Sequence, residues 1–366
     1  MAIELADIFR EYGAAYRQKH AEHLLPSHRQ AMRAIELCRT EDLGGQVFEC
    51  SSCGETRYSY HSCRNRHCPK CQHEQTQDWL KLQRRLLLNA PYFMLTFTLP
   101  SELRKLASRN QRLFYNLLFQ TSAQVTQKLA QKSRSIGGQI GLIGVLHTWT
   151  RNLAFHPHVH YLAPGGGLSA NGAWLPARHR YFLPVKVLSK LFKMAFFSAL
   201  KKHPVSSRIA PAVWRKAWVV HCKSVGDGQA ALKYLAPYIH RVAISNRRLL
   251  ALKHRGSLET SQVTFLYRSS DTGQVKHSTL SVERFIHRFL QHILPQGFVK
   301  VRYFGFFAPT QRSKLKTLQQ QLGLTQLEPQ EQSTSQPQDN PSPLCTKCGT
   351  PLRFLRDLPP LLSRSP

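Results

Sequence analysis

The sequence predicts a protein of mixed helices and strands with a cysteine-rich segment near the amino terminus. Runs of β-branched and aromatic residues closed by proline or glycine predict strands, as at residues 92–99 and 142–146. Apolar residues at helical spacing predict helices between these strands. The nine cysteines fall mostly between residues 38 and 71, which sets that segment apart from the rest of the chain.

The charge of the chain indicates its class of partner. Lys and Arg number 51 against 20 Asp and Glu, which gives a formal net charge of +31 over 366 residues, and the basic residues are spread along the whole chain. Such an excess predicts a polyanionic partner, with nucleic acid favoured over a membrane surface. We find no run of about 18 apolar residues that would span a bilayer, and the first residues do not resemble a signal peptide. We therefore expect a soluble, intracellular protein that binds nucleic acid.

Two pairs of cysteines predict a structural zinc site. Cys50-x2-Cys53 is followed after 14 residues by Cys68-x2-Cys71, and four thiolates can occupy the corners of the tetrahedron that zinc requires. Some neighbours are close enough in sequence to replace one of these ligands, namely Cys38, His61, Cys63 and His67. The site is therefore better defined than its ligand set.

A third pair, Cys345-x2-Cys348, is only half of a zinc site. It is either degenerate or completed by other cysteines, such as those of another copy of the chain. It follows a segment at about 325–343 that is rich in Gln, Ser and Pro and is typical of a flexible linker.

The elements before the first histidine-containing strand alternate in type. Residues 1–40 are predicted to be helical, and the zinc segment from about 38 to 73 presents cations that could contact phosphates. These cations are Arg57, Arg64, Arg66 and Lys70. Residues 92–100 then read as the first central strand, and residues 102–132 are predicted to be helical.

The run His-Pro-His-Val-His at residues 156–160 predicts a metal site. On a strand, His158 and His160 project to the same side and can share one ion. The turn-like residues 151–153 predict a hairpin that places His147 opposite His158, where cross-strand side chains are about 5 Å apart. His147 and His156 are both candidates for a third ligand, and we favour His147.

Residues 185–221 are predicted to be mostly helical, and a further helix is expected from Gln229. Tyr234 and Tyr238 are four residues apart on that helix and would share one face, where a phenol could attack a phosphate beside a metal ion. Pro237 lies between them and could kink the helix. A buried aromatic pair is the structural alternative, although the neighbouring basic residues make it less favoured. Beyond this helix, strands are expected at 263–267 and 275–280 and a helix at 282–293.

Taken together, these motifs resemble the HUH single-strand endonucleases, and among them the bacterial rolling-circle insertion-sequence transposases with two tyrosines. The resemblance covers roughly residues 20–312. Its motifs, in chain order, are CRNRHCPKC at 63–71, FMLTFTLP at 93–100, HVH at 158–160, YLAPYIHR at 234–241 and RVAISN at 241–246.

The resemblance implies a ferredoxin-like α+β nuclease core with an antiparallel central sheet, behind an N-terminal zinc-binding module. His158 and His160 would bind Mg²⁺ or Mn²⁺. Tyr234 and Tyr238 would be nucleophiles that form a 5′-phosphotyrosine with single-stranded DNA at element ends, and Arg241 would help to neutralise the phosphate. Host replication or helicase proteins are further candidate partners, and the expected location is the bacterial cytoplasm, at the nucleoid.

We expect three regions, namely a helical and zinc-binding domain at 1–90, a catalytic domain at 91–312 and a flexible tail at 313–366. Two alternative functions remain open. One is a plasmid or phage replication initiator or relaxase of the same superfamily, which is disfavoured because the chain has no Gly-x4-Gly-Lys-Ser/Thr phosphate loop. The other is a zinc-containing nucleic-acid-binding protein without catalytic activity.

Overall fold

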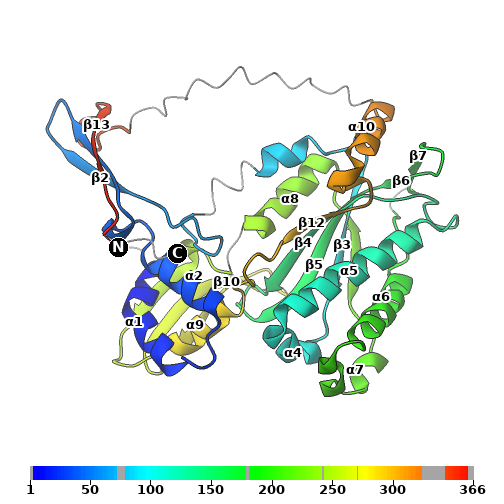
Figure 1. Cartoon of the computed structure of the whole chain (residues 1–366), viewed down its shortest axis with the longest axis horizontal. Helices are drawn as coiled ribbons and strands as arrows, with labels where there is room; N and C mark the ends of the chain where they lie inside the picture. Colours follow the sequence, from blue (N-terminus) through cyan, green and yellow to red (C-terminus); the bar gives the residue numbers. More distant parts are fainter. Residues whose placement is uncertain are drawn as a thin grey trace.

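The computed structural model describes residues 3–71, 79–178, 181–240, 243–269, 271–323 and 343–361. Figure 1 shows a central sheet covered by helices, with the N-terminal helices and two smaller sheets beside it. Among the described residues, no helix is both long and apolar enough to cross a membrane.

The central sheet has five strands in the order β12-β4-β5-β3-β8, and every neighbouring pair is antiparallel. This arrangement confirms the expected mixed fold with an antiparallel core sheet. Its strands are β3 (Tyr92–Thr98), β4 (Leu142–Trp149), β5 (Phe155–Pro164), β8 (Val220–Ser224) and β12 (Val301–Phe304).

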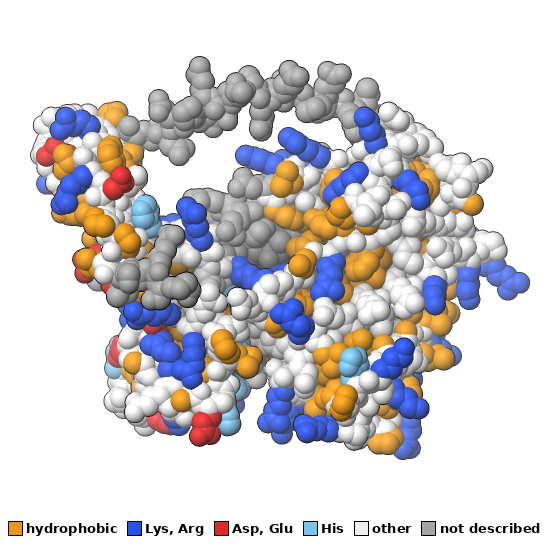
Figure 2. Space-filling view, in the orientation of Figure 1, with side chains coloured by type: hydrophobic (Ala, Val, Ile, Leu, Met, Phe, Trp, Pro, Cys, Tyr) orange, Lys and Arg blue, Asp and Glu red, His pale blue; other side chains and the backbone are white. Residues whose placement is uncertain are grey.

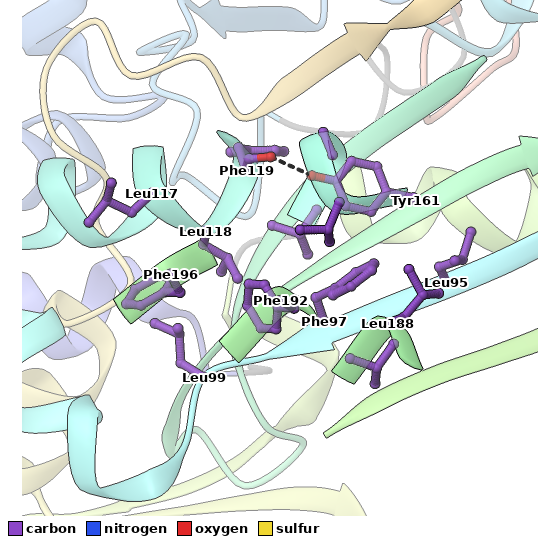
Figure 3. Close-up of a cluster of buried hydrophobic side chains, with 14 of the residues drawn as sticks. Leu95, Phe97, Leu99, Leu117, Leu118, Phe119, Tyr161, Leu188, Phe192 and Phe196 are labelled. Atoms are coloured by element: carbon purple, nitrogen blue, oxygen red, sulfur yellow. Dashed lines mark hydrogen bonds between the residues drawn. The ribbon is translucent and has the colours of Figure 1, made fainter. Parts of the chain in front are cut away.

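Helices α4 (Arg104–Arg109), α5 (Gln111–Ala130) and α6 (Val185–Leu200) cover one face of this sheet. Figure 3 shows the aromatic core between them, in which the Phe97 ring of β3 meets the Phe192 ring edge-on at 5.1 Å. The Tyr161 hydroxyl donates a hydrogen bond of 3.0 Å to the carbonyl oxygen of Phe119. The polar atom of this buried tyrosine is thereby satisfied.

The other face is covered by α8 (Gly228–His240) and α10 (Arg312–Gln321). Leu232 and Leu235 of α8 are buried in one cluster with Met94 of β3 and Ile143 of β4. The helix begins close to the sheet, since a Cβ atom at Gly228 would lie only 2.9 Å from the Tyr92 ring. Glycine at this position therefore allows the close approach.

A second core lies beside the central sheet. It joins α1 (Leu5–Lys19) and α2 (Pro26–Glu36) to α9 (Val282–Leu290) and to the sheet β11-β10-β9. The strands of that sheet are β9 (Leu249–Lys253), β10 (Gln262–Arg268) and β11 (Val275–Ser281). The Phe9 ring of α1 meets the Phe289 ring of α9 edge-on at 5.5 Å. The N-terminal helices thus share a core with residues well beyond 90, so the cores do not follow the expected linear boundary.

The third sheet corrects the expectation that residues 313–366 form a flexible tail. Within that range α10 is helical, and β13 (Leu352–Leu358) pairs with β1 (Gly45–Cys50), which also pairs with β2 (Thr56–Tyr60). The order is β13-β1-β2. The sequence did not predict this strand, because its partner β1 lies about 300 residues earlier and the preceding linker has a composition typical of a flexible segment. Most of the linker, residues 324–342, lies outside the described residues, as do residues 362–366.

A further difference concerns residues 185–221, which end in a strand and not in a helix. Between α6 and β8 lie a short helix, α7 (Ala212–Arg215), and a 3-10 turn at Pro204–Arg208. His221 and Cys222 of β8 pair with Thr96 and Leu95 of β3. Pairing with a central strand overrides the local pattern, which is the usual limit of strand prediction from sequence. A small hairpin, β6 (Gly166–Leu168) and β7 (Trp174–Pro176), follows β5.

Candidate active site and metal centres

Three histidines meet on the face of the central sheet that carries α8. The hairpin between β4 and β5 places His147 opposite His158 and Val145 opposite His160, so the predicted register is confirmed. One ring nitrogen of each of His147, His158 and His160 lies within 4.8 Å of the other two. His147 Nδ1 is 2.9 Å from His158 Nε2. Adjacent ligands of an octahedral Mg²⁺ ion are about 3 Å apart, so this spacing fits a shared ion.

The neighbouring groups orient two of these rings. Nδ1 of His158 lies 2.6 Å from the carbonyl oxygen of His156, so the ring can donate there and keep the Nε2 lone pair for a metal. Nδ1 of His160 lies 2.9 Å from Oγ1 of Thr96, which pairs with it across β3 and β5. Thr96 was not foreseen, because only the register of β3 places it beside His160.

Burial keeps the three imidazoles neutral. It lowers the pKa of His147 and His158 well below the ordinary value, and it lowers the pKa of His160 to about 4. Neutral rings retain the lone pairs that metal ligation requires. The residues present therefore fit a divalent cation.

His156, the other candidate for the third position, is engaged elsewhere. Its Nδ1 lies 2.5 Å from Nη2 of Arg104 in α4, and burial followed by the Arg104 charge lowers its pKa to about 4. The structure therefore brings His147, and not His156, together with the pair His158 and His160.

The predicted tyrosines are positions 234 and 238 of α8, and the helix continues through Pro237 to His240. The helix starts beside Tyr92, and Ala243 and Ile244, just beyond it, belong to the same buried cluster as Trp149. α8 packs on the face of the sheet that carries the histidines, because Leu232 and Leu235 are buried in one cluster with Val145, the residue opposite His160. The side chains of Tyr234 and Tyr238, and Arg241 entirely, lie outside the described residues.

A half-buried lysine lies close to this site and was not predicted from the sequence. The ammonium group of Lys300 lies 5.0 Å from the centre of the Trp149 ring. Burial, with a smaller contribution from the charge of Arg66, lowers the pKa of Lys300 to about 7. The position directly before β12 gave no signal in the sequence, because a single lysine in so basic a chain is unremarkable.

The cysteines form two clusters, which corrects the predicted set of Cys50, Cys53, Cys68 and Cys71. The first cluster is Cys38, Cys63, Cys68 and Cys71, and the second is Cys50, Cys53, Cys345 and Cys348. In the first, Sγ of Cys38 lies 3.5 Å from Sγ of Cys71 and 3.6 Å from Sγ of Cys68. Four sulfurs bound to one zinc ion at 2.3 Å are about 3.8 Å apart, so the geometry fits zinc. The pair Cys50 and Cys53 lies apart from the pair Cys68 and Cys71, because the hairpin of β1 and β2 carries Cys50 and Cys53 away from the loop at 63–71.

The loop of the first cluster is fastened to the region that follows α9. Arg66 donates hydrogen bonds to the carbonyl oxygens of Phe298 (2.7 Å) and Pro295 (3.0 Å). Lys70 forms an ion pair of 2.5 Å with Glu4. Arg57 also donates to the carbonyl oxygen of Leu344 (3.3 Å), so three of the four cations that were expected to contact phosphates have partners within the protein.

The chain is similar to known transposases. A family described as "Putative transposase" matches residues 141–314, and a "Transposase zinc-binding domain" matches residues 8–99. A protein named "Putative transposase y4qJ" from Sinorhizobium fredii is 41% identical over 350 residues, which is 90% of this chain and 86% of the relative. The chain belongs to the IS91-type transposase family. A second member, "Transposase for insertion sequence element IS801" from Pseudomonas savastanoi pv. phaseolicola, is 29% identical over 74% of this chain and 68% of its own length. No solved structure matches.

The surface agrees with a protein that acts on DNA, as transposases do. Figure 2 shows Lys and Arg side chains spread over this face of the molecule. In that view the Asp and Glu side chains gather over the N-terminal helices and over the small sheet β13-β1-β2, which we call the β-ribbon, and the side of the central sheet is basic. A basic surface of this kind attracts the phosphates of nucleic acid.

Proposed function

We propose that this transposase cleaves and rejoins single-stranded DNA at the ends of an insertion sequence, through a covalent 5′-phosphotyrosine, as in rolling-circle transposition. The observation that carries the proposal is the cluster of His147, His158 and His160 on the sheet face that α8 crosses. A neutral histidine cluster beside a helix with two tyrosines combines a cation site with a nucleophile.

In this proposal His147, His158 and His160 hold Mg²⁺ or Mn²⁺, with Thr96 orienting the ring of His160. The bound ion would supply positive charge at the scissile phosphate. The chain provides the remaining parts of the reaction. The three rings stay neutral through burial, and α8 packs on the same face of the sheet.

Tyr234 or Tyr238 is the proposed nucleophile. Its phenolic oxygen forms a bond to phosphorus while the bond from phosphorus to the 3′ oxygen breaks. The phenol loses its proton, and the departing 3′ oxygen gains one, so the products are a phosphotyrosine and a free 3′-hydroxyl. Attack by a 3′-hydroxyl on the phosphotyrosine reverses the step and joins strands. Arg241 would offset the negative charge of the phosphate.

We further propose that the zinc ion of the N-terminal domain is held by Cys38, Cys63, Cys68 and Cys71. Two hydrogen bonds from Arg66 hold the loop of this site against Pro295 and Phe298, in the segment just before β12. The chain has no phosphate loop of its own, so host replication or helicase proteins would expose the single strand. Such a substrate implies work at the bacterial nucleoid.

The test is covalent capture on single-stranded DNA that carries candidate element ends, with Mg²⁺ or Mn²⁺. We expect an adduct that survives denaturation and maps by mass spectrometry to Tyr234 or Tyr238. The double variant Tyr234→Phe with Tyr238→Phe should form no adduct yet bind DNA as before. Tyr181→Phe is the matched control, because Tyr181 is 49% exposed and precedes α6. Cleavage that persists in the double variant would refute the proposal.

The histidines need a separate test. His158→Ala should abolish the adduct and remove its dependence on added Mn²⁺, while DNA binding stays within about threefold. His277→Ala is the control, since His277 is an exposed histidine on β11. An unchanged adduct yield in His158→Ala would remove the histidine cluster from the reaction.

A further inference from the structure

The second cysteine cluster joins two parts of the chain that are far apart in sequence. Sγ of Cys50 lies 3.4 Å from Sγ of Cys348, and Sγ of Cys53 lies 3.6 Å from Sγ of Cys345. Cys53 and Cys348 are 3.7 Å apart at sulfur, although their positions differ by 295. These separations exceed the S–S bond of about 2.05 Å in a disulfide. They match the edges of a tetrahedron around zinc, which are about 3.8 Å long.

The two halves of the cluster have the same backbone conformation. The amide of Cys50 donates to the carbonyl of Glu55 (2.9 Å), and the amide of Gly54 donates to the carbonyl of Cys50 (2.9 Å). The C-terminal half repeats this pattern, with Cys345 donating to Thr350 (2.8 Å) and Gly349 donating to Cys345 (2.9 Å).

Each turn ends in a glycine with positive φ, +71° at Gly54 and +75° at Gly349. Residues with a side chain are strained at positive φ, whereas glycine is not. Glycine therefore permits the tight turn that directs both sulfurs of a pair toward one point. Two equivalent turns that face each other are what a four-sulfur metal site needs. A degenerate half-site would not need a matching turn opposite it.

The β-ribbon around the cluster has very little core of its own. The buried cluster comprises only Cys50, Cys345 and Leu352, with Phe48 packed against it. Pairing of β13 with β1 runs from Gly45 opposite Leu358 to Cys50 opposite Leu352. A sheet of three short strands with so few buried side chains needs a metal ion or another crosslink to be stable.

We propose that Cys50, Cys53, Cys345 and Cys348 bind a second structural zinc ion, which fixes the C-terminal segment to the N-terminal module. The four thiols release their protons on binding and coordinate as thiolates. The matched zinc-binding domain ends at residue 99 and so contains only two of these ligands. In this site Cys50 and Cys53 of the same chain complete the half-site formed by Cys345 and Cys348. This second zinc site does not depend on the proposed DNA chemistry.

The direct test is the zinc content of the full chain, measured by elemental mass spectrometry after exhaustive dialysis. We expect two zinc ions per wild-type chain and one in the double variant Cys345→Ser with Cys348→Ser. Cys222→Ser is the matched control and should keep two, because Cys222 lies on β8 and in neither cluster. One ion in the wild type, or two in the double variant, would overturn the proposal.

A second test, with all the cysteines intact, measures whether zinc holds the C-terminal segment to the rest of the chain. A protease site is inserted in the Gln/Ser/Pro-rich segment 325–343, and the cut protein is passed through a sizing column. We expect the C-terminal fragment to elute with the body, and to separate once a chelator removes zinc.

Two results would contradict the inference. A fragment that separates before chelation would show that the two halves do not meet within one chain. A fragment that stays bound after all zinc has been removed would show that the ion does not fasten it. Elution of the uncut protein as a monomer distinguishes a site within the chain from one shared between copies.

Discussion

The two cysteine clusters each offer four thiols but receive different support from the rest of the fold. Cys38 and Cys68 of the first are buried in the core that joins α1, α2 and α9, and its loop is fastened by Arg66. The second lies in a small ribbon, with Cys53 and Cys348 exposed. From this difference we expect that zinc bound at the first cluster would stabilise a large core, whereas zinc bound at the second would stabilise only the ribbon and its strand β13.

The largest expected effect comes from the first cluster. Cys68→Ser removes a sulfur from a site that is packed into the second core. We expect the free energy of unfolding to fall by about 4 kcal/mol or more, since structural zinc contributes on the order of 10 kcal/mol in small domains. The melting temperature should then fall by about 10 °C in calorimetry. A fall of the same size in Cys222→Ser would show that the metal is not the cause.

The next effect tests the fastening of the zinc loop. Arg66→Ala removes two hydrogen bonds from a charged donor to the carbonyls of Pro295 and Phe298. We expect a loss of about 2 kcal/mol in chemical denaturation. Arg57→Ala, on the ribbon, removes one exposed contact of 3.3 Å to the carbonyl of Leu344 and should cost under about 1 kcal/mol. Equal losses would remove the contrast between the two clusters.

Chelation sharpens the same comparison by rate. Two ligands of the second cluster are exposed and its ribbon has little core, so that site should open locally more often. We expect two phases of zinc release to a coloured chelator, with the faster about tenfold quicker, a difference of about 1.4 kcal/mol in barrier. The variant Cys345→Ser with Cys348→Ser should lack the faster phase, and loss of the slower phase would contradict this assignment.

The smallest effect is expected from the second cluster on the main unfolding transition. Cys345→Ser with Cys348→Ser should change the melting temperature by less than about 2 °C, because few buried contacts join the ribbon to either core. Hydrogen exchange should nevertheless rise along β1 and β13. A fall as large as that of Cys68→Ser would mean that the ribbon supports the whole fold.

Much of the fold followed from local sequence. The helices at the amino terminus, the strand from Tyr92, the hairpin around residues 151–153 and the helix of the two tyrosines were all predicted, because periodicity and turn residues act over short distances. The strands β8 and β13 were not, since each is defined by a partner distant in sequence. The linear boundary at residue 90 also missed the core shared by α1 and α9.

The site shows the same division. His147, His158 and His160 could be grouped from sequence because a hairpin fixes which residues face each other. The cysteines could not, because two adjacent pairs with zinc-like spacing suggested one site, whereas the strands carry Cys50 and Cys53 to Cys345 and Cys348. Lys300 and Thr96 were missed because their roles depend on burial and on sheet register.

The pairing of β1 with β13 also affects how the chain is made. Cys53 and Cys345 are 292 positions apart, and ribosomes add about 5–20 residues per second. For about 15–60 s of each round of translation, the outer edge of β1 has no partner strand and two thiols await their counterparts. Until Cys345 and Cys348 have been made, a new chain is therefore exposed to oxidation and to edge-to-edge pairing with its neighbours.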